Sequence, residues 1–329
     1  MDHTLLMNIL VCPRDKLCLR EEGDDLVCEC GHRYAVIEGI PILLVSEAEQ
    51  THIEGTRALV LAESRDVASL PQFNVAEGEV DPFVRAAIGG TNDSLYEHLV
   101  GKLKEYPVPL LRLPNGKGKL FLEVGCNWGR WCLAAATAGY HPVGIDPSLK
   151  AIRAARRVAR QLGVEASYIV GDSRFLPFRT DVFDQVFSYS VLQHLSKPDA
   201  RESLREIRRV LRIGGEALVQ MPNVFGIRCL YHRIRRFREA TDFEVRYWKP
   251  ADLLSAFSTC IGPSKISVDV YFSLNVQPSD LRFFSAKYRA VVHTSEALRK
   301  LSHYFPPLVR VADSLYVSCQ RTDADPSRS

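Results

Sequence analysis

No stretch of the chain is long and apolar enough to span a bilayer, and the charged n-region of a secretory signal peptide is missing after Met1. The nine cysteines lack the spacing of a disulfide framework. The formal net charge of +3 is too small to indicate a nucleic-acid partner by itself. These absences favour a protein of the reducing cytoplasm without a membrane span, and they leave its oligomeric state open.

Two glycines are also missing from the place where a dinucleotide-binding fingerprint needs them. Counted from Gly125, the pattern Gly-x-Gly-x-x-Gly meets Asn127 and Arg130. The stretch Phe121-Leu-Glu-Val-Gly-Cys-Asn-Trp-Gly still predicts a buried strand, a tight turn and the start of a helix. Because asparagine tolerates positive φ, Asn127 can replace the middle glycine of a second pattern, Asp/Glu-x-Gly-x-Gly-x-Gly.

More strands that end in acids follow this turn. Asp146 closes the stretch 140–146 and lies 21 residues after Gly125 (146 − 125), a separation at which an acid binds the two hydroxyls of a ribose. The stretches 167–172, 183–189 and 214–220 predict three further strands, and helical patterns over 148–162 and 201–211 alternate with them. This alternation predicts an α/β fold whose ligands bind at the carboxyl ends of parallel strands.

Residues 118–222 resemble the class I S-adenosylmethionine (SAM)-dependent methyltransferases, and most of all the methyltransferase type 11 group. The matching stretches are Leu122-Glu-Val-Gly-Cys-Asn-Trp-Gly, Val143-Gly-Ile-Asp-Pro-Ser, Gly171-Asp-Ser-Arg-Phe-Leu-Pro-Phe, 183–194 and 209–215. The resemblance implies a Rossmann-like methyltransferase domain over 118–320 with a seven-stranded, mostly parallel sheet. Its last strand, near 312–319, would be antiparallel and inserted beside the fifth, and a disordered tail, 321–329, would follow.

The same resemblance implies S-adenosyl-L-methionine as cofactor and assigns its site. Asp146 would hold the ribose and Asp172 the adenine amino group, while the glycine turn would contact the methionine end. Tyr189 or Ser190 would close the floor of the site. The expected cofactor-binding residues are Glu123, Gly125, Cys126, Asn127, Gly129, Asp146, Pro147, Asp172, Ser173, Tyr189 and Ser190.

Two residues just past the fourth strand are candidates for the chemistry. Methyl transfer needs a general base only when the acceptor must lose a proton, and His194 is the best placed side chain for that role. Gln193 would orient the acceptor. The alternative is that His194 only packs at the edge of the pocket.

Residues 1–48 carry paired Cys and His turns of the kind found in zinc ribbons. One closed site for a structural Zn²⁺ would use Cys12, Asp15, Cys28 and His32, and another would substitute Cys18 or Cys30. The alternative is a small β unit that has lost its metal. The stretches 5–13, 26–28 and 34–44 resemble the small zinc-binding subunit that activates tRNA, rRNA and release-factor methyltransferases, which implies a separate module for stabilisation or partner docking.

Residues 49–117 are expected to form a linker and a helical lid over the cofactor, with a hinge at 89–96; a helix packed on the sheet is the alternative. Arg153, Arg156, Arg157 and Arg160 are expected on a solvated helix face. A second arginine group follows the fifth strand and would face substrate or RNA backbone: Arg228, Arg233, Arg235, Arg236 and Arg238.

The end of the fourth strand limits the acceptor. It reads Ser188-Tyr-Ser-Val rather than Asn-Pro-Pro-Tyr, which argues against methylation of adenine N6 or of a glutamine amide. The sequence therefore favours transfer to an O or C atom of a small molecule such as a lipid, quinone, glycan or secondary metabolite. The alternative is an RNA- or translation-factor-directed methyltransferase that docks its substrate through the N-terminal ribbon.

Overall fold

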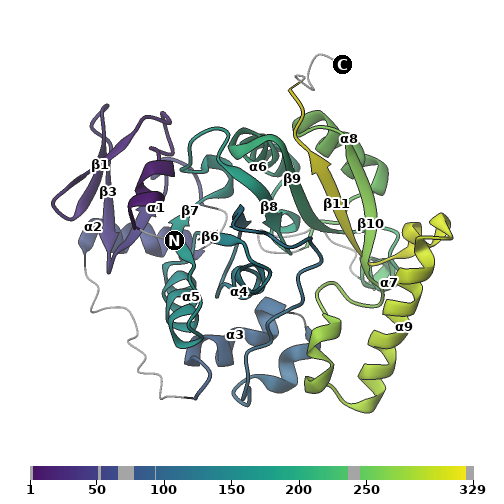
Figure 1. Cartoon of the computed structure of the whole chain (residues 1–329). Helices are drawn as coiled ribbons and strands as arrows, with labels where there is room; N and C mark the ends of the chain where they lie inside the picture. Colours follow the sequence, from purple (N-terminus) through teal and green to yellow (C-terminus); the bar gives the residue numbers. More distant parts are fainter. Residues whose placement is uncertain (1–2, 51–52, 66–77, 93, 236–244, 324–329) are drawn as a thin grey trace.

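The computed structural model describes residues 3–50, 53–65, 78–92, 94–235 and 245–323 (Figure 1). Seven strands of one sheet lie between residues 118 and 320: β5 (Leu120–Val124), β6 (His141–Asp146), β7 (Ser167–Gly171), β8 (Phe183–Ser188), β9 (Leu211–Pro222), β10 (Ser264–Val270) and β11 (Ser314–Gln320). They are ordered β7-β6-β5-β8-β9-β11-β10. β5 to β9 are parallel, and β11 is antiparallel to both β9 and β10, which confirms the predicted α/β methyltransferase topology.

Helices cover both faces of this sheet (Figure 1). Leu204 of α6 and Phe257 of α8 share one apolar cluster with Leu122 of β5, whereas Leu133 of α4 and Ile152 of α5 belong to a second. The helices and 3-10 turns of this part are α4 (Arg130–Thr137), α5 (Leu149–Gln161), η3 (Ser173–Phe175), η4 (Leu192–His194), α6 (Lys197–Val210), α7 (Ile227–Arg235), α8 (Pro250–Cys260), η5 (Pro278–Phe283), α9 (Ala286–Ser302) and η6 (Pro306–Val311). No helix among the described residues is long and apolar enough to cross a membrane.

The strands of the N-terminal module continue the same sheet. After α1 (His3–Ile9), the strands β1 (Leu19–Glu22), β2 (Asp25–Cys28), β3 (Arg33–Ile37) and β4 (Ile40–Leu43) pair antiparallel, and β4 then pairs parallel with β7 through Ile42↔Val170 and Leu43↔Gly171. The described sheet therefore has eleven strands. The physical reason is that β7 would otherwise present an unpaired edge, and β4 is buried at every residue.

Three of the four arginines of α5 contact other segments of the chain, which corrects the prediction of a solvated helix face, whereas Arg160 is exposed as predicted. Arg153 donates from Nε to Glu38 Oε2 at 2.8 Å, and Arg156 donates to the Glu38 carbonyl, both in the turn between β3 and β4. Arg157 donates from Nε to Oδ2 of the fully buried Asp81 at 2.7 Å. Helical periodicity alone does not distinguish arginines that meet acids of other segments from arginines that meet water.

The segment between the module and β5 contains α2 (Ile53–Ser64), α3 (Pro82–Asn92) and η2 (Ser94–Leu99). Gly89 and Gly90 lie inside α3, so they do not interrupt a helix as a hinge there would. A Cβ on Gly89 would lie 3.2 Å from the Cα of Glu97, which explains the glycine by the close approach of η2 rather than by flexibility. Asp93, within the expected hinge, lies outside the described residues.

Candidate functional site

The turn after β5 has the backbone that its sequence predicts. Gly125 and Gly129 have φ of 76° and 80°, and Asn127 has φ of 46°, the left-handed conformation that asparagine tolerates. A Cβ on Gly125 would lie 2.2 Å from Cγ2 of Val191, so the neighbouring chain also excludes a side chain there. The turn leads directly into α4, whose first amide groups point towards the carboxyl edge of the sheet.

Asp146 ties this turn to the end of β6. Its Oδ2 accepts from the Asn127 amide and its Oδ1 from the Ser148 amide, both at 2.9 Å. These two amide hydrogen bonds fix the orientation of the carboxylate at the carboxyl end of β6. Beside it, Cys126 is buried in the turn and Pro147 is half-buried.

Asp172 follows the last residue of β7, and its carboxylate is paired with Arg174, a residue that the sequence did not lead us to expect in the site. Arg174 donates from Nη2 to Asp172 Oδ2 at 2.7 Å and from Nε to Oδ1 at 3.1 Å. The same guanidinium donates to the Glu49 carbonyl at 2.6 Å, which fastens the chain leaving the N-terminal module to this edge. Ser173 turns its hydroxyl towards Ser203 of α6, at 2.8 Å. The sequence signal that could have identified Arg174 is a basic residue two positions after the acid that follows a strand.

Glu123 lies under the turn and faces α4. Its Oε2 accepts from the Cys132 amide in the first turn of that helix at 2.7 Å, where a carboxylate also complements the helix dipole. Burial nevertheless raises the pKa of the Glu123 carboxyl to about 8, because desolvation of the charged form outweighs the Cys132 hydrogen bond and the nearby Arg130. The side chain therefore supports the turn from below.

This raised pKa predicts how stability depends on pH. The folded pKa of about 8 lies above the ordinary value of 4.5, so folded Glu123 keeps a proton that the unfolded chain has lost. Its contribution is complete below pH 4.5 and is lost as the pH rises through about 8, with a slope of about 1.4 kcal/mol per pH unit in between. We expect Glu123→Gln to remove this slope in urea unfolding titrations. Parallel pH curves for the two proteins would contradict the assignment.

The end of β8 carries a group of polar side chains around Ser190, which itself has φ of 62°. Gln193 donates from Nε2 to Ser190 Oγ at 2.6 Å, and Asn275 donates from Nδ2 to the same atom at 3.3 Å. The Gln193 Nε2 also lies 3.3 Å from Nε2 of the partly exposed His194. The structure thus brings the two predicted chemical residues and Ser190 together.

Two buried acceptors in this group have no donor among the described residues: Gln193 Oε1 and Asn275 Oδ1. Tyr189 is directed elsewhere, since its hydroxyl donates to the fully buried Asp269 at 2.6 Å. Sequence reasoning missed Asn275 because it is 85 residues beyond Ser190 and no local pattern marks it. Of the second arginine group, Arg236 and Arg238 lie outside the described residues.

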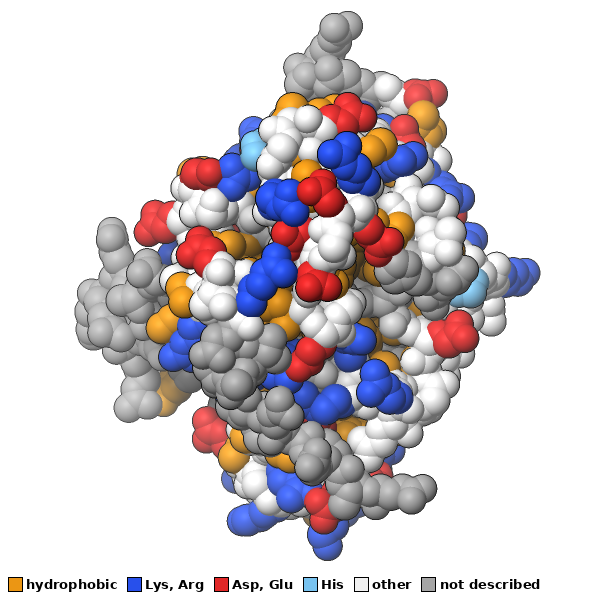
Figure 2. Space-filling model, turned by 90° about the vertical axis from the view of Figure 1, so that its left-hand side faces the viewer, with side chains coloured by type: hydrophobic (Ala, Val, Ile, Leu, Met, Phe, Trp, Pro, Cys, Tyr) orange, Lys and Arg blue, Asp and Glu red, His pale blue; other side chains and the backbone are white. Residues whose placement is uncertain are grey.

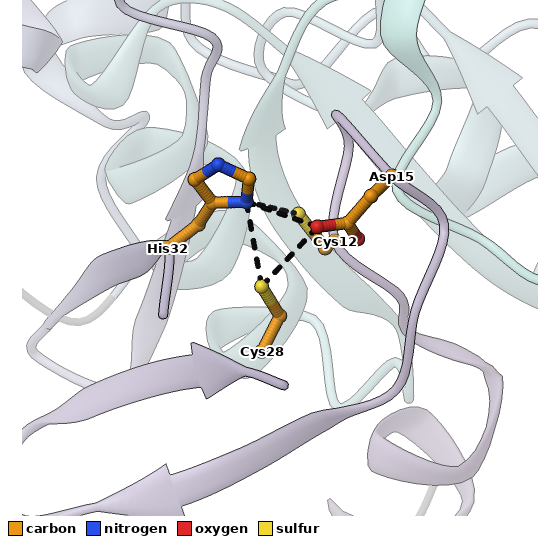
Figure 3. Close-up of side chains that lie close together, drawn as sticks. All are labelled: Cys12, Asp15, Cys28 and His32. Atoms are coloured by element: carbon orange, nitrogen blue, oxygen red, sulfur yellow. Dashed lines mark hydrogen bonds and ion pairs between the residues drawn. The ribbon is translucent and has the colours of Figure 1, made fainter. Parts of the chain in front are cut away.

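The N-terminal module gathers four side chains from two turns (Figure 3). Single ligand atoms of Cys12, Asp15, Cys28 and His32 all lie within 4.8 Å of one another. His32 Nδ1 is 3.6 Å from Cys12 Sγ, 3.4 Å from Cys28 Sγ and 3.0 Å from Asp15 Oδ2. A tetrahedral zinc site with bonds of about 2.0–2.3 Å has ligand atoms about 3.3–3.8 Å apart, a range that includes both sulfur distances from His32 but not its distance to Asp15. Two thiolates, an imidazole and a carboxylate are ligand types that zinc accepts, so the chemistry of the donor set fits zinc.

Neighbouring groups orient these ligands. The Leu17 amide donates to Asp15 Oδ1 at 2.9 Å, which leaves Oδ2 facing the cluster, and the Tyr34 hydroxyl lies 3.1 Å from Cys12 Sγ. Cys18 and Cys30, the alternatives from the sequence, are exposed and stand outside the cluster. Of the two sets left open by the sequence, the structure assembles the first.

Comparison with known proteins now adds to this geometry. The family model described as a methyltransferase domain matches residues 121–215. The norajmaline N-methyltransferase of Rauvolfia serpentina is 28% identical over 146 residues, which are 44% of this chain and 49% of that enzyme. A tRNA U34 carboxymethyltransferase of Alcanivorax borkumensis is 35% identical over 121 residues, 36% of either chain. This chain thus spans half or less of the length of both enzymes.

A third relative is much shorter. A UPF0434 protein of Vesicomyosocius okutanii is 48% identical over 46 residues, which are 14% of this chain and 78% of that protein. The central α/β part therefore carries a methyltransferase domain with the class I fold, and through a 46-residue stretch the chain belongs to the UPF0434 family.

Proposed function

We propose that this protein transfers a methyl group from SAM to a hydroxyl oxygen of a small molecule. The observation that carries the proposal is the pair of buried acceptors, Gln193 Oε1 and Asn275 Oδ1, beside Ser190 at the carboxyl end of β8. A buried acceptor without a donor costs about 1–3 kcal/mol, and an incoming hydroxyl would supply that donor. An aliphatic carbon acceptor would not.

Each part of the site has a role in this proposal. Asp146 binds the ribose, the turn 125–129 contacts the methionine end, and Asp172, held by Arg174, receives the adenine amino group. The segment 78–117 acts as the lid, supported by a buried ion pair in which Arg130, at the start of α4, donates to Asp280 at 3.1 Å. Tyr96 of η2 donates to the same carboxylate, so the lid contacts the cofactor-binding helix through Asp280.

In this reaction the main task of the protein is to position the acceptor hydroxyl against the methyl group. When bound, SAM supplies a sulfonium methyl group, which the acceptor oxygen takes as the carbon–sulfur bond breaks and a neutral thioether leaves. Gln193 and Asn275 orient the hydroxyl by accepting its hydrogen bond. His194, in contact with Gln193, takes the hydroxyl proton as general base.

Labelled SAM and a cell extract separated into small-molecule, RNA and protein fractions test this proposal. We expect the label in the small-molecule fraction, as a methyl group on oxygen. We expect Gln193→Leu to lower the rate of that labelling about 100-fold, since a positioned contact to the reacting group is lost, while SAM affinity in calorimetry changes less than threefold. Label confined to RNA or protein would refute the proposal.

An RNA substrate is the second candidate, and the relative that modifies tRNA U34 favours it. Figure 2 shows the face that carries the N-terminal module, where Lys and Arg alternate with Asp and Glu instead of forming one basic field. A protein that binds RNA through phosphate contacts loses affinity steeply as salt rises. RNA binding with that salt dependence would favour this candidate.

The cluster of Cys12, Asp15, Cys28 and His32 is proposed to hold a structural zinc ion. All four positions would be filled by protein, which leaves no open position for catalysis and gives the metal a purely stabilising role.

A further inference from the structure

Helix α7 presents an apolar stripe to the outside of the molecule. Ile227, Leu230, Tyr231 and Ile234 follow the spacing of one helix face and are between 44% and 63% exposed. Phe225, just before the helix, is half exposed as well. A stripe of this regularity differs from the single exposed apolar residues of ordinary surfaces.

The opposite face of α7 is the one fixed to the protein. Cys229 is buried, and its amide donates to Asp313 Oδ1 at 2.9 Å. At about 100° per residue, Cys229 lies roughly 150° from the centre of the stripe. The face of α7 that contains Cys229 therefore packs on the protein, and the stripe faces away from the core.

The charge of α7 indicates what covers this stripe. Its sequence, Ile-Arg-Cys-Leu-Tyr-His-Arg-Ile-Arg, contains three arginines and no acid. Aliphatic residues on one face of a basic helix are typical of helices that lie in the interface of an anionic membrane. Sequence-tolerant RNA binding relies on aromatic stacking, whereas this stripe is mostly aliphatic. A stable protein interface takes about 20–30 residues a side, far more than one nine-residue helix offers.

We propose that α7 docks the protein on the surface of an anionic phospholipid bilayer. The stripe inserts at the level of the headgroups, and the positive charge of the helix sequence favours the anionic surface. α7 follows β9 at the carboxyl edge of the sheet, where Gln220 of β9 accepts from the Ser190 amide (Figure 1). Docking through α7 therefore turns the edge that carries the Ser190 group towards the membrane. The docking itself does not depend on the proposed methyl transfer.

Flotation of the full chain with vesicles tests this docking. One set of vesicles is phosphatidylcholine alone, and the other contains about 30% phosphatidylglycerol. We expect the protein to float with the anionic set and to bind the neutral set at least tenfold more weakly. Leu230→Ser/Ile234→Ser should lower binding to the anionic vesicles at least tenfold. The matched control is Leu162→Ser/Ile213→Ser, which removes two exposed apolar side chains elsewhere and should bind as the parent does.

Thermal unfolding and SAM calorimetry on both double variants separate docking from folding and from the proposed activity. Three results would overturn the proposal: no binding to anionic vesicles by the parent protein, equal binding by Leu230→Ser/Ile234→Ser, or a dimer of the parent in light scattering that this variant abolishes. The last result would assign the stripe to a second copy of the chain.

Discussion

Asp146→Ala is expected to weaken SAM binding more than 100-fold in titration calorimetry. A hydrogen bond to a charged group contributes about 1.5–3 kcal/mol, and a ribose diol makes two of them. About 3 kcal/mol already corresponds to a factor above 100 in affinity. The turn between β5 and α4 adds to the loss, since the Asn127 and Ser148 amides then lack their acceptor.

A matched control comes from the opposite end of the parallel strands, where β5 and β8 begin. The Asp184 carboxylate of β8 also accepts from a backbone amide, that of Leu120, at 2.9 Å. Asp184→Ala should therefore lose a similar structural hydrogen bond and keep its SAM affinity. Urea unfolding of both variants shows whether each is folded under the conditions of the titration. If the affinity of Asp146→Ala stays within threefold of the parent, the ribose assignment is wrong.

His32→Ala is expected to remove bound zinc and to lower the unfolding temperature by about 10 °C. Structural zinc supplies folding free energy directly, and a chain of this size shifts by about 2–4 °C for each kcal/mol. His32 is partly exposed, so its truncation leaves little apolar packing unfilled, in contrast to the buried Cys12 and Cys28. Elemental analysis and thermal unfolding measure the two effects.

Cys30→Ser is the matched control for the metal. Cys30 lies close in sequence to Cys28 but is exposed and outside the cluster. We expect this variant to keep one equivalent of zinc and the parent unfolding temperature. Two results would show that the four side chains form only a hydrogen-bonded cluster. The first is that the parent protein, purified without a chelator, contains no metal; the second is that the His32→Ala variant retains as much zinc as the parent.

Most strands and helices of the methyltransferase domain were predictable from local sequence patterns. The strands β5, β6 and β7 were predictable because each is an apolar run with an acid and a turn at its end. These acids are Glu123, Asp146 and Asp172. The left-handed turn at Asn127 followed from the conformational preference of one residue type. These features depend on neighbours in sequence, and periodicity or turn chemistry records such neighbours well.

Pairings between distant segments were not predictable in this way. An apolar stretch such as β4 specifies burial and not its partner, so the pairing of Leu43 with Gly171 left no local trace. The arginines of α5 likewise look solvated in sequence because Glu38 and Asp81 lie far along the chain. The approach of Asn275 to Ser190 belongs to the same class. The strand ends and the turn at the proposed cofactor edge were thus predictable from the sequence, while the contact of Asn275 with Ser190 and the attachment of the N-terminal module were not.

The pairing of β4 with β7 also has a consequence for assembly. A partner strand supplied by a separate subunit is lost on dilution, because its association depends on the concentrations of both chains. Here the strand is covalently attached to the sheet it completes, so its effective concentration is set by the connecting chain and stays the same at any protein concentration. The protein therefore carries its sheet extension at a fixed one-to-one stoichiometry, independent of how much of any other polypeptide the cell makes.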